Sequence, residues 1–113
     1  MSEPSVIQQL FDVLVSRKTD PQQNSYTCKL LNSGHEKIAA KIREEAEEVI
    51  EAATEEGQEG RDHLTCEAAD LTYHLLVMLV HGDVEWKGVE AELARRFGVS
   101  GLDEKAARGK DGT

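Results

Sequence analysis

The sequence has 113 residues and a formal net charge of −9 at pH 7. This length suits one domain with a modest hydrophobic core. The negative charge argues against a nucleic-acid backbone or an anionic membrane as the main partner, although nucleotides could bind if metal ions intervened. The longest apolar run, from Leu75 to Val80, is too short to span a bilayer. We therefore expect one domain that binds neither nucleic acid nor membrane.

The cysteines indicate the redox compartment. Cys28 and Cys66 lie far apart in the sequence and form no CxxC pair. The first ten residues lack the basic segment that opens a signal peptide. We therefore expect two free thiols in a reducing, cytoplasmic compartment.

The first third of the chain predicts two helices. Apolar residues recur at helical spacing over residues 6–15, and Ser5 with Gln8 has the spacing of a capping box. The polar stretch over residues 20–24, which begins Asp-Pro, predicts a loop. A short helix should follow this loop and end at Gly34.

Two long helices are predicted in the middle of the chain. Ser33 and Glu36 repeat the capping-box spacing and open the first, which is followed by a turn over residues 57–61. Asp62 can cap the second, which should end near residue 81 and is apolar nearly all round. Such a helix should lie at the centre of the fold.

A last helix is predicted between Asp83, which can cap its start, and Gly98. No strand-like alternation appears in the sequence. We therefore expect an all-α fold of about five helices in a single domain over residues 1–108, with a disordered tail over residues 109–113. Because so short a chain cannot easily cover its apolar central helix, dimerisation or a larger homo-oligomer should complete the bundle.

Five carboxylates on the two long helices are the most informative feature of the sequence. On a helical wheel, Glu45 lies beside the apolar stripe of the first long helix, with Glu44 and Glu48 as neighbours. Glu67 and Asp70 interrupt the otherwise apolar second long helix. Carboxylates brought together away from water repel one another, and a hard cation relieves that repulsion. The pattern therefore predicts a site for Mg²⁺ or Mn²⁺ between the two helices.

A solvated face is the alternative interpretation of the glutamates, because runs of charge usually face water. Glu47, Glu51 and Glu55 point away from the apolar stripe and are expected to face solvent. The apolar residues that border Glu67 and Asp70 favour a lined cleft for the second helix.

Zinc is a competing metal, because two His–carboxylate pairs on the second long helix have the four-residue spacing of ligands. Neither a His-Glu-x-x-His signature nor a cysteine pair supports zinc. His63 and His81 are expected as helix-end residues. His74 is either a buried core histidine or a residue that orients a carboxylate or a phosphate.

The acidic pattern resembles the signature of the all-α nucleoside-triphosphate pyrophosphatase superfamily: Glu44-Glu45-x-x-Glu48, then Glu67-x-x-Asp70. Within it, the chain resembles the phosphoribosyl-ATP pyrophosphatases. Four further segments carry this closer resemblance: Ser25-Tyr26-Thr27, Gly34-x-x-Lys37-Ile38-x-x-Lys41, Tyr73-His74 and Gly101-Leu102-x-Glu104-Lys105-Ala106. Two positions depart from the family pattern, since Arg43 stands where many members have glycine and Thr72 replaces a leucine.

The resemblance implies Mg²⁺-dependent hydrolysis of phosphoribosyl-ATP to phosphoribosyl-AMP and pyrophosphate, the second step of histidine biosynthesis. Metal held by the five carboxylates would neutralise the triphosphate, and Glu45 or Glu48 would accept a proton from the attacking water. The implied substrate-binding residues are Tyr26, Thr27, Lys37, Lys41, His74, Lys105 and Arg108.

Two other functions remain open from the sequence. A general house-cleaning pyrophosphatase would share the carboxylates and act on ordinary or damaged nucleotides. A non-catalytic acidic module that dimerises and binds a partner protein would need only the helical pattern and the charge.

Overall fold

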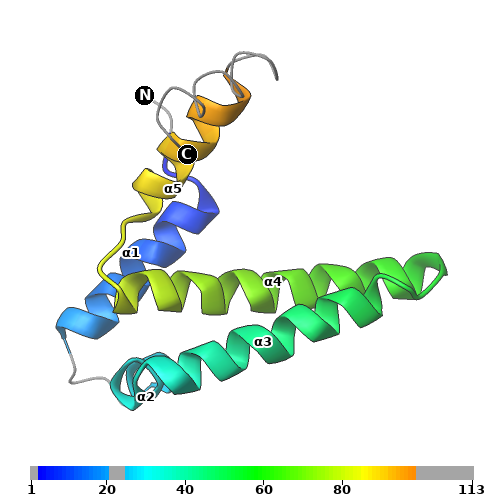
Figure 1. Cartoon of the computed structure of the whole chain (residues 1–113), viewed down its shortest axis with the longest axis horizontal. Helices are drawn as coiled ribbons and strands as arrows, with labels where there is room; N and C mark the ends of the chain where they lie inside the picture. Colours follow the sequence, from blue (N-terminus) through cyan, green and yellow to red (C-terminus); the bar gives the residue numbers. More distant parts are fainter. Residues whose placement is uncertain (1–2, 21–24, 99–113) are drawn as a thin grey trace, which may run out of the picture.

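The computed structural model describes residues 3–20 and 25–98 of the chain. It contains five helices: α1 (Val6–Thr19), α2 (Tyr26–Ser33), α3 (His35–Ala52), α4 (Gly57–His81) and α5 (Trp86–Phe97) (Figure 1). No strand occurs in these described ranges. The predicted all-α class with five helices is confirmed, whereas the predicted domain end at residue 108 and the tail lie outside the described residues.

Short-range hydrogen bonds explain where the first two helices begin. The Ser5 hydroxyl oxygen accepts a hydrogen bond from the backbone N–H of Gln8 at 3.1 Å, as the capping-box spacing predicts. Ser25 caps α2 in the same way, through the backbone N–H of Cys28 at 3.1 Å. Gly34 then separates α2 from α3 with φ of 93°, a left-handed conformation that other residues rarely adopt.

Three predicted caps are wrong. Ser33 is the last residue of α2, and α3 follows Gly34 without a side-chain cap. Asp62 lies inside α4, where its carboxylate accepts a hydrogen bond from the Gln58 side chain at 2.7 Å.

The third of these caps was expected at Asp83. Asp83 has φ of 60° and forms an ion pair with Lys18 of α1 at 2.7 Å. Helix α5 begins only after Glu85. The Asp62 carboxylate therefore serves a local contact within α4, whereas that of Asp83 serves a tertiary contact with α1.

The predicted turn over residues 57–61 is also wrong, because α4 already begins at Gly57. Gly60 is buried, and a Cβ atom there would lie 2.5 Å from the backbone oxygen of Glu55. Glycine at this position allows the first turn of α4 to approach the backbone of Glu55, in the connection that follows α3. Gly57 and Gly60, which suggested a turn, therefore lie in the first turn of α4, directly after the short connection from α3.

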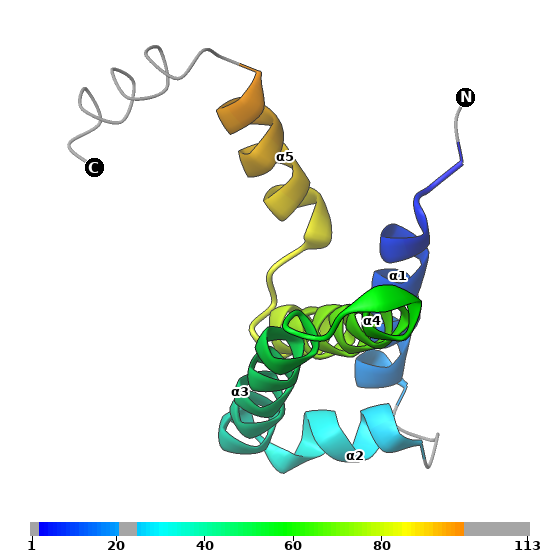
Figure 2. The same cartoon turned by 90° about the vertical axis from the view of Figure 1, so that its right-hand side faces the viewer.

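The hydrophobic core lies where α1, α2 and the start of α3 meet the C-terminal half of α4. The long helices α3 and α4 run antiparallel and side by side, and α1 crosses α4 near its C-terminal end (Figures 1 and 2). The buried cluster consists of Phe11, Leu14, Leu30, Ile38, Leu76, Val77 and Val80. Burial of each such side chain stabilises the fold by roughly 1.5–3 kcal/mol.

The prediction of a central second long helix holds only for the C-terminal half of α4. Ala68 and Ala69 are exposed near the middle of α4, and even in its C-terminal half Leu75 is 43% exposed. Helix α5 has no buried residue and projects away from α2 and α3 (Figure 2). Within the described residues, no helix is long and apolar enough to cross a membrane.

Candidate active site

Three of the five predicted carboxylates converge between α3 and α4. One carboxylate oxygen each of Glu45, Glu67 and Asp70 lies within 4.8 Å of the others. Glu67 and Asp70 are three residues apart and share one face of α4, while Glu45 reaches them from the neighbouring helix α3. We call these three residues the acidic cluster.

The other two predicted metal-binding residues lie around the acidic cluster. Glu48 is half-buried, and its carboxylate is close enough to those of Glu45 and Glu67 to help raise the pKa of both, after burial. Glu44 is exposed and lies toward Tyr26, whose phenol has a pKa that is raised mainly by burial and least by the negative charge of Glu44. Glu48 therefore extends the cluster, whereas Glu44 stands at its edge.

Burial and mutual repulsion perturb the cluster. Glu45 is only 8% exposed, and its Oε2 atom is buried without a hydrogen-bond partner. Burial, the hydrogen bond with Glu48 and the charges of Asp70, Glu48 and Glu67 raise the pKa of Glu45 to about 7. Burial, followed by Glu48 and Asp70, also raises the pKa of Glu67. An unpartnered buried oxygen among crowded carboxylates fits a divalent cation that takes oxygen ligands.

His74 joins the acidic cluster to α2. The residue is 7% exposed, and its Nδ1 atom donates a hydrogen bond to the backbone oxygen of Asp70 at 3.0 Å. Nε2 is then the acceptor for the hydroxyl group of Tyr26 at 2.9 Å. Nδ1 also lies 3.6 Å from Oε1 of Glu45. His74 is thus both a buried histidine and a neighbour of two cluster residues.

A second link between α2 and α4 involves a residue that the site prediction had not included. The hydroxyl groups of Thr27 and Tyr73 are hydrogen-bonded, and Thr27 is buried. The Tyr73 ring also makes an edge contact with the His74 ring, with centroids 5.2 Å apart. The Tyr-His pair in the sequence was the available signal, although it was used there only for the family resemblance.

His63 contacts a member of the acidic cluster and does not lie at a helix end. Its Nδ1 atom is 3.0 Å from each carboxylate oxygen of Glu55, and Nε2 is 3.4 Å from Oε2 of Glu67. The interpretation as a helix-end residue is wrong, because α4 starts six residues earlier, at Gly57. The acidic cluster itself contains only carboxylates, and oxygen ligands favour Mg²⁺ or Mn²⁺ over zinc.

The predicted phosphate-binding cations are only partly placed. Lys41 is half-buried on α3, and its charge opposes the rise in the pKa of Tyr26. Lys37 is exposed one turn earlier on the same helix. Lys105 and Arg108 lie outside the described residues.

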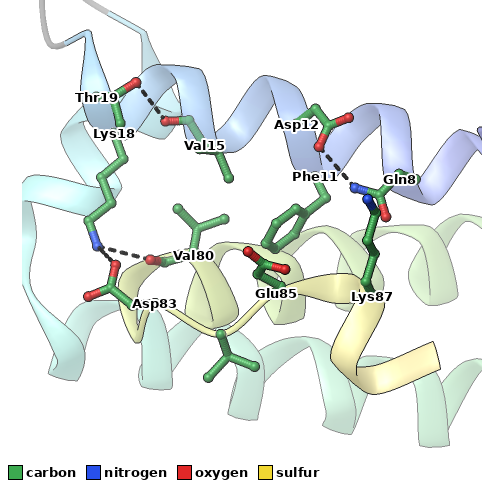
Figure 3. Close-up of a pocket in the computed structure, with 11 residues that line it drawn as sticks. Gln8, Phe11, Asp12, Val15, Lys18, Thr19, Val80, Asp83, Glu85 and Lys87 are labelled. Atoms are coloured by element: carbon green, nitrogen blue, oxygen red, sulfur yellow. Dashed lines mark hydrogen bonds and ion pairs between the residues drawn. The ribbon is translucent and has the colours of Figure 1, made fainter. Parts of the chain in front are cut away.

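A separate cavity of about 600 Å³ lies between α1 and the connection from α4 to α5 (Figure 3). Phe11, Val15 and Val80 supply apolar walls. At one end, Lys18 donates hydrogen bonds to Asp83 at 2.7 Å and to the Val80 backbone oxygen at 3.0 Å. None of the residues that line this cavity belongs to the predicted site, so the cavity and the acidic cluster are separate.

Known proteins resemble this chain over nearly its whole length. Residues 7–97 match the family model described as phosphoribosyl-ATP pyrophosphohydrolase. A phosphoribosyl-ATP pyrophosphatase of Rhodopirellula baltica is 50% identical over 102 residues, which cover 90% of this chain and 85% of the relative. That of Paramagnetospirillum magneticum is 49% identical over 109 residues, or 96% of both chains. That of Nitrosospira multiformis is 44% identical over 108 residues, which cover 96% of this chain and 87% of the relative.

Proposed function

Because the chain belongs to the phosphoribosyl-ATP pyrophosphohydrolase family, we propose that it hydrolyses phosphoribosyl-ATP to phosphoribosyl-AMP and pyrophosphate, a step of histidine biosynthesis. The observation that carries this proposal is the convergence of Glu45, Glu67 and Asp70 between two helices of the matched region. Hydrolysis of a phosphoric anhydride needs little covalent chemistry from the protein and depends on positioning and charge stabilisation.

Mg²⁺ is the proposed cofactor, and Mn²⁺ is a substitute with the same preference for oxygen. Glu45, Glu67 and Asp70 would hold the cation, with Glu48 beside them and Glu44 at the edge. When bound, the cation would offset the negative charge of the triphosphate. The unpartnered Oε2 atom of Glu45 supports this assignment, because a buried carboxylate oxygen otherwise loses its hydration without compensation.

Glu48 is the better candidate for the general base. Its carboxylate borders the acidic cluster but is not among the three whose oxygens converge. An oxygen of Glu48 could therefore accept the proton of the attacking water while the water oxygen bonds to phosphorus and the anhydride oxygen leaves with pyrophosphate. Glu45, the other candidate from the sequence, is more useful as a ligand because it lies deeper.

The substrate would extend from the acidic cluster toward α2. Lys41 and Lys37 lie on successive turns of α3 and could bind phosphate groups. Tyr26 is 51% exposed beside Lys41, so its ring could form part of the wall of a substrate site. Thr27 is buried against Tyr73 and therefore shapes this wall from behind. Binding by Lys105 and Arg108 stays a prediction.

A substrate panel tests the proposed activity. The protein is incubated with Mg²⁺ and either phosphoribosyl-ATP, the ordinary nucleoside triphosphates or oxidised nucleotides, and released pyrophosphate is measured. We expect release from phosphoribosyl-ATP alone. Release from the whole panel would support a house-cleaning enzyme, and no release from any substrate would support an acidic interaction module.

Substitutions then connect the activity to the cluster. Glu48→Ala and Asp70→Ala should abolish turnover while the helical circular dichroism spectrum is unchanged. Glu47→Ala is the matched control, because Glu47 is exposed on the same helix as Glu48. Full activity in either of the first two variants would contradict the proposed site.

A homodimer or larger homo-oligomer is also proposed. Ile50 of α3 is 60% exposed, while Leu93 and Phe97 of α5 are 51% and 82% exposed. Apolar side chains exposed on two elements support a surface that another copy covers. Light scattering coupled to size-exclusion chromatography should give at least twice the mass of the chain, and a monomeric mass would refute this proposal.

The expected compartment remains a proposal. Cys28 is buried, Cys66 is exposed, and both thiols are free. Free thiols suit a reducing environment such as the cytoplasm. Fractionation of cells followed by detection of the protein would test this location.

A further inference from the structure

A histidine outside the acidic cluster touches one of its members. His63 Nε2 lies 3.4 Å from Oε2 of Glu67, one helical turn away on α4. His63 Nδ1 lies 3.0 Å from both carboxylate oxygens of Glu55, in the connection between α3 and α4. The imidazole ring thus stands between two carboxylates, of which only Glu67 belongs to the cluster.

The backbone holds Glu55 in this position. A Cβ atom at Gly60 would lie 2.5 Å from the backbone oxygen of Glu55 and 3.0 Å from its Cβ atom. Only glycine at residue 60 therefore allows Glu55 to lie so close to the first turns of α4. His63 follows Gly60 by three residues and shares its face of the helix, within reach of the Glu55 carboxylate.

The exposure of these side chains indicates what the contact does. The Glu67 side chain is 13% exposed, whereas those of His63 and Glu55 are 45% and 47% exposed. An ion pair with this much solvent contributes little to the stability of the fold. Its effect on Glu67 is different, because a ring nitrogen 3.4 Å from one oxygen of a metal-binding carboxylate restricts how that carboxylate turns.

We propose that His63, held by Glu55, is a positioning residue that orients the Glu67 carboxylate toward the divalent cation. This inference rests on the proposed function, since it assigns a role within the same metal site. His63 is not itself a ligand, because both ring nitrogens already face carboxylate oxygens and the convergent group contains Glu45, Glu67 and Asp70 only. The chain Glu55–His63–Glu67 instead links the α3–α4 connection to the site.

Metal binding without substrate provides the test. Affinity for Mn²⁺ is measured by calorimetry at pH 8 for the full chain and for His63→Ala, His63→Gln and Glu55→Gln. We expect His63→Ala to bind Mn²⁺ roughly tenfold more weakly, the lower end of the usual effect of losing such a partner. His63→Gln should recover part of the affinity, because its amide can still donate to Glu67. Melting temperatures should stay close to that of the wild type.

Kinetics and a double variant separate positioning from other effects. His63→Ala should raise the Mg²⁺ concentration that gives half-maximal activity and leave kcat at saturating Mg²⁺ nearly unchanged. Combining it with Glu55→Gln should add nothing further, because Glu55 acts through His63. Arg61→Gln is the control, since it removes a positive charge in the same part of α4 from a side chain that hydrogen-bonds to Gln58.

Each outcome bears on one of the two proposals. Unchanged or tighter Mn²⁺ binding by His63→Ala would overturn the positioning role while leaving the proposed function intact. An equal loss in Arg61→Gln would also overturn it, because the effect would then come from charge alone. Failure of the wild type both to bind Mn²⁺ and to hydrolyse phosphoribosyl-ATP would overturn the proposed function itself and this inference with it.

Discussion

Protons and the divalent cation should compete for the carboxylate of Glu45. Burial first, then Glu48, Asp70 and Glu67, raise the pKa of Glu45 to about 7. A carboxylate must lose its proton before it binds a metal ion, so metal binding at this residue releases a proton. Because the pKa is raised, the protonated fraction grows as the pH falls through 7, and metal affinity should fall with it.

The size of the effect follows from this pKa of about 7. For Glu45 alone, competition weakens the apparent affinity about 11-fold at pH 6, about twofold at pH 7 and about 1.1-fold at pH 8. Affinity should therefore drop about tenfold between pH 8 and pH 6. At pH 7, where the carboxyl is half protonated, each cation that binds should release about half a proton.

Calorimetric titration with Mn²⁺ measures both quantities. Titrations at pH 7 in two buffers with different ionisation enthalpies give the number of protons released, and titrations at pH 6 and pH 8 give the affinities. Glu47→Gln should behave as the wild type, because Glu47 is exposed on the same helix. Glu45→Gln should bind weakly, with a smaller change in affinity between pH 6 and pH 8 than the wild type shows. An affinity in the wild type that does not depend on pH, with no proton release, would refute this reasoning.

Three further predictions concern the metal-free fold. In EDTA, the free energy of unfolding of the wild type should fall by about 1–3 kcal/mol relative to that of Glu45→Gln as the pH rises from 5 to 8. The reason is that the raised pKa of Glu45 makes its ionisation unfavourable in the folded state. Melting temperatures of the two proteins that change equally with pH would contradict this. Gly60→Ala should cost on the order of 1–3 kcal/mol in urea unfolding, since its Cβ atom would lie 2.5 Å from the Glu55 oxygen; an unchanged midpoint would show that the connection can relax. Tyr26→Phe should cost about 1 kcal/mol in urea unfolding by removing the hydroxyl that donates to His74, and this cost should largely vanish in the His74→Phe background; additive costs in the double variant would contradict the pairing.

The sequence predicted the helices better than it predicted their ends. Helical periodicity is a property of neighbouring residues, so the five helices could be recognised without the fold. Capping spacing is common by chance, and the Ser5 cap formed whereas those expected at Ser33 and Asp62 did not. Asp83 instead accepts a hydrogen bond from Lys18, which is 65 positions away and which no local pattern could connect with it.

The sequence alone determined which carboxylates share a face. Residues three apart on a helix lie on one side, so Glu67 and Asp70 had to be neighbours once α4 formed. Only the packing of α3 against α4 decided that Glu45 reaches them while Glu44 stays at the edge. Distances between helices depend on how closely their backbones approach, and this is a property of the whole fold.

The same reason explains why His63 was misjudged and His74 was left open. The partners of both rings come from other segments: Glu55 from the connection and Tyr26 from α2. Spacing along α4 could place each histidine on a face but could not say what that face meets. The acidic pattern could therefore be recognised in the sequence. The side chains that contact it were decided by the tertiary structure, because they come from segments that only the packing of the helices brings together.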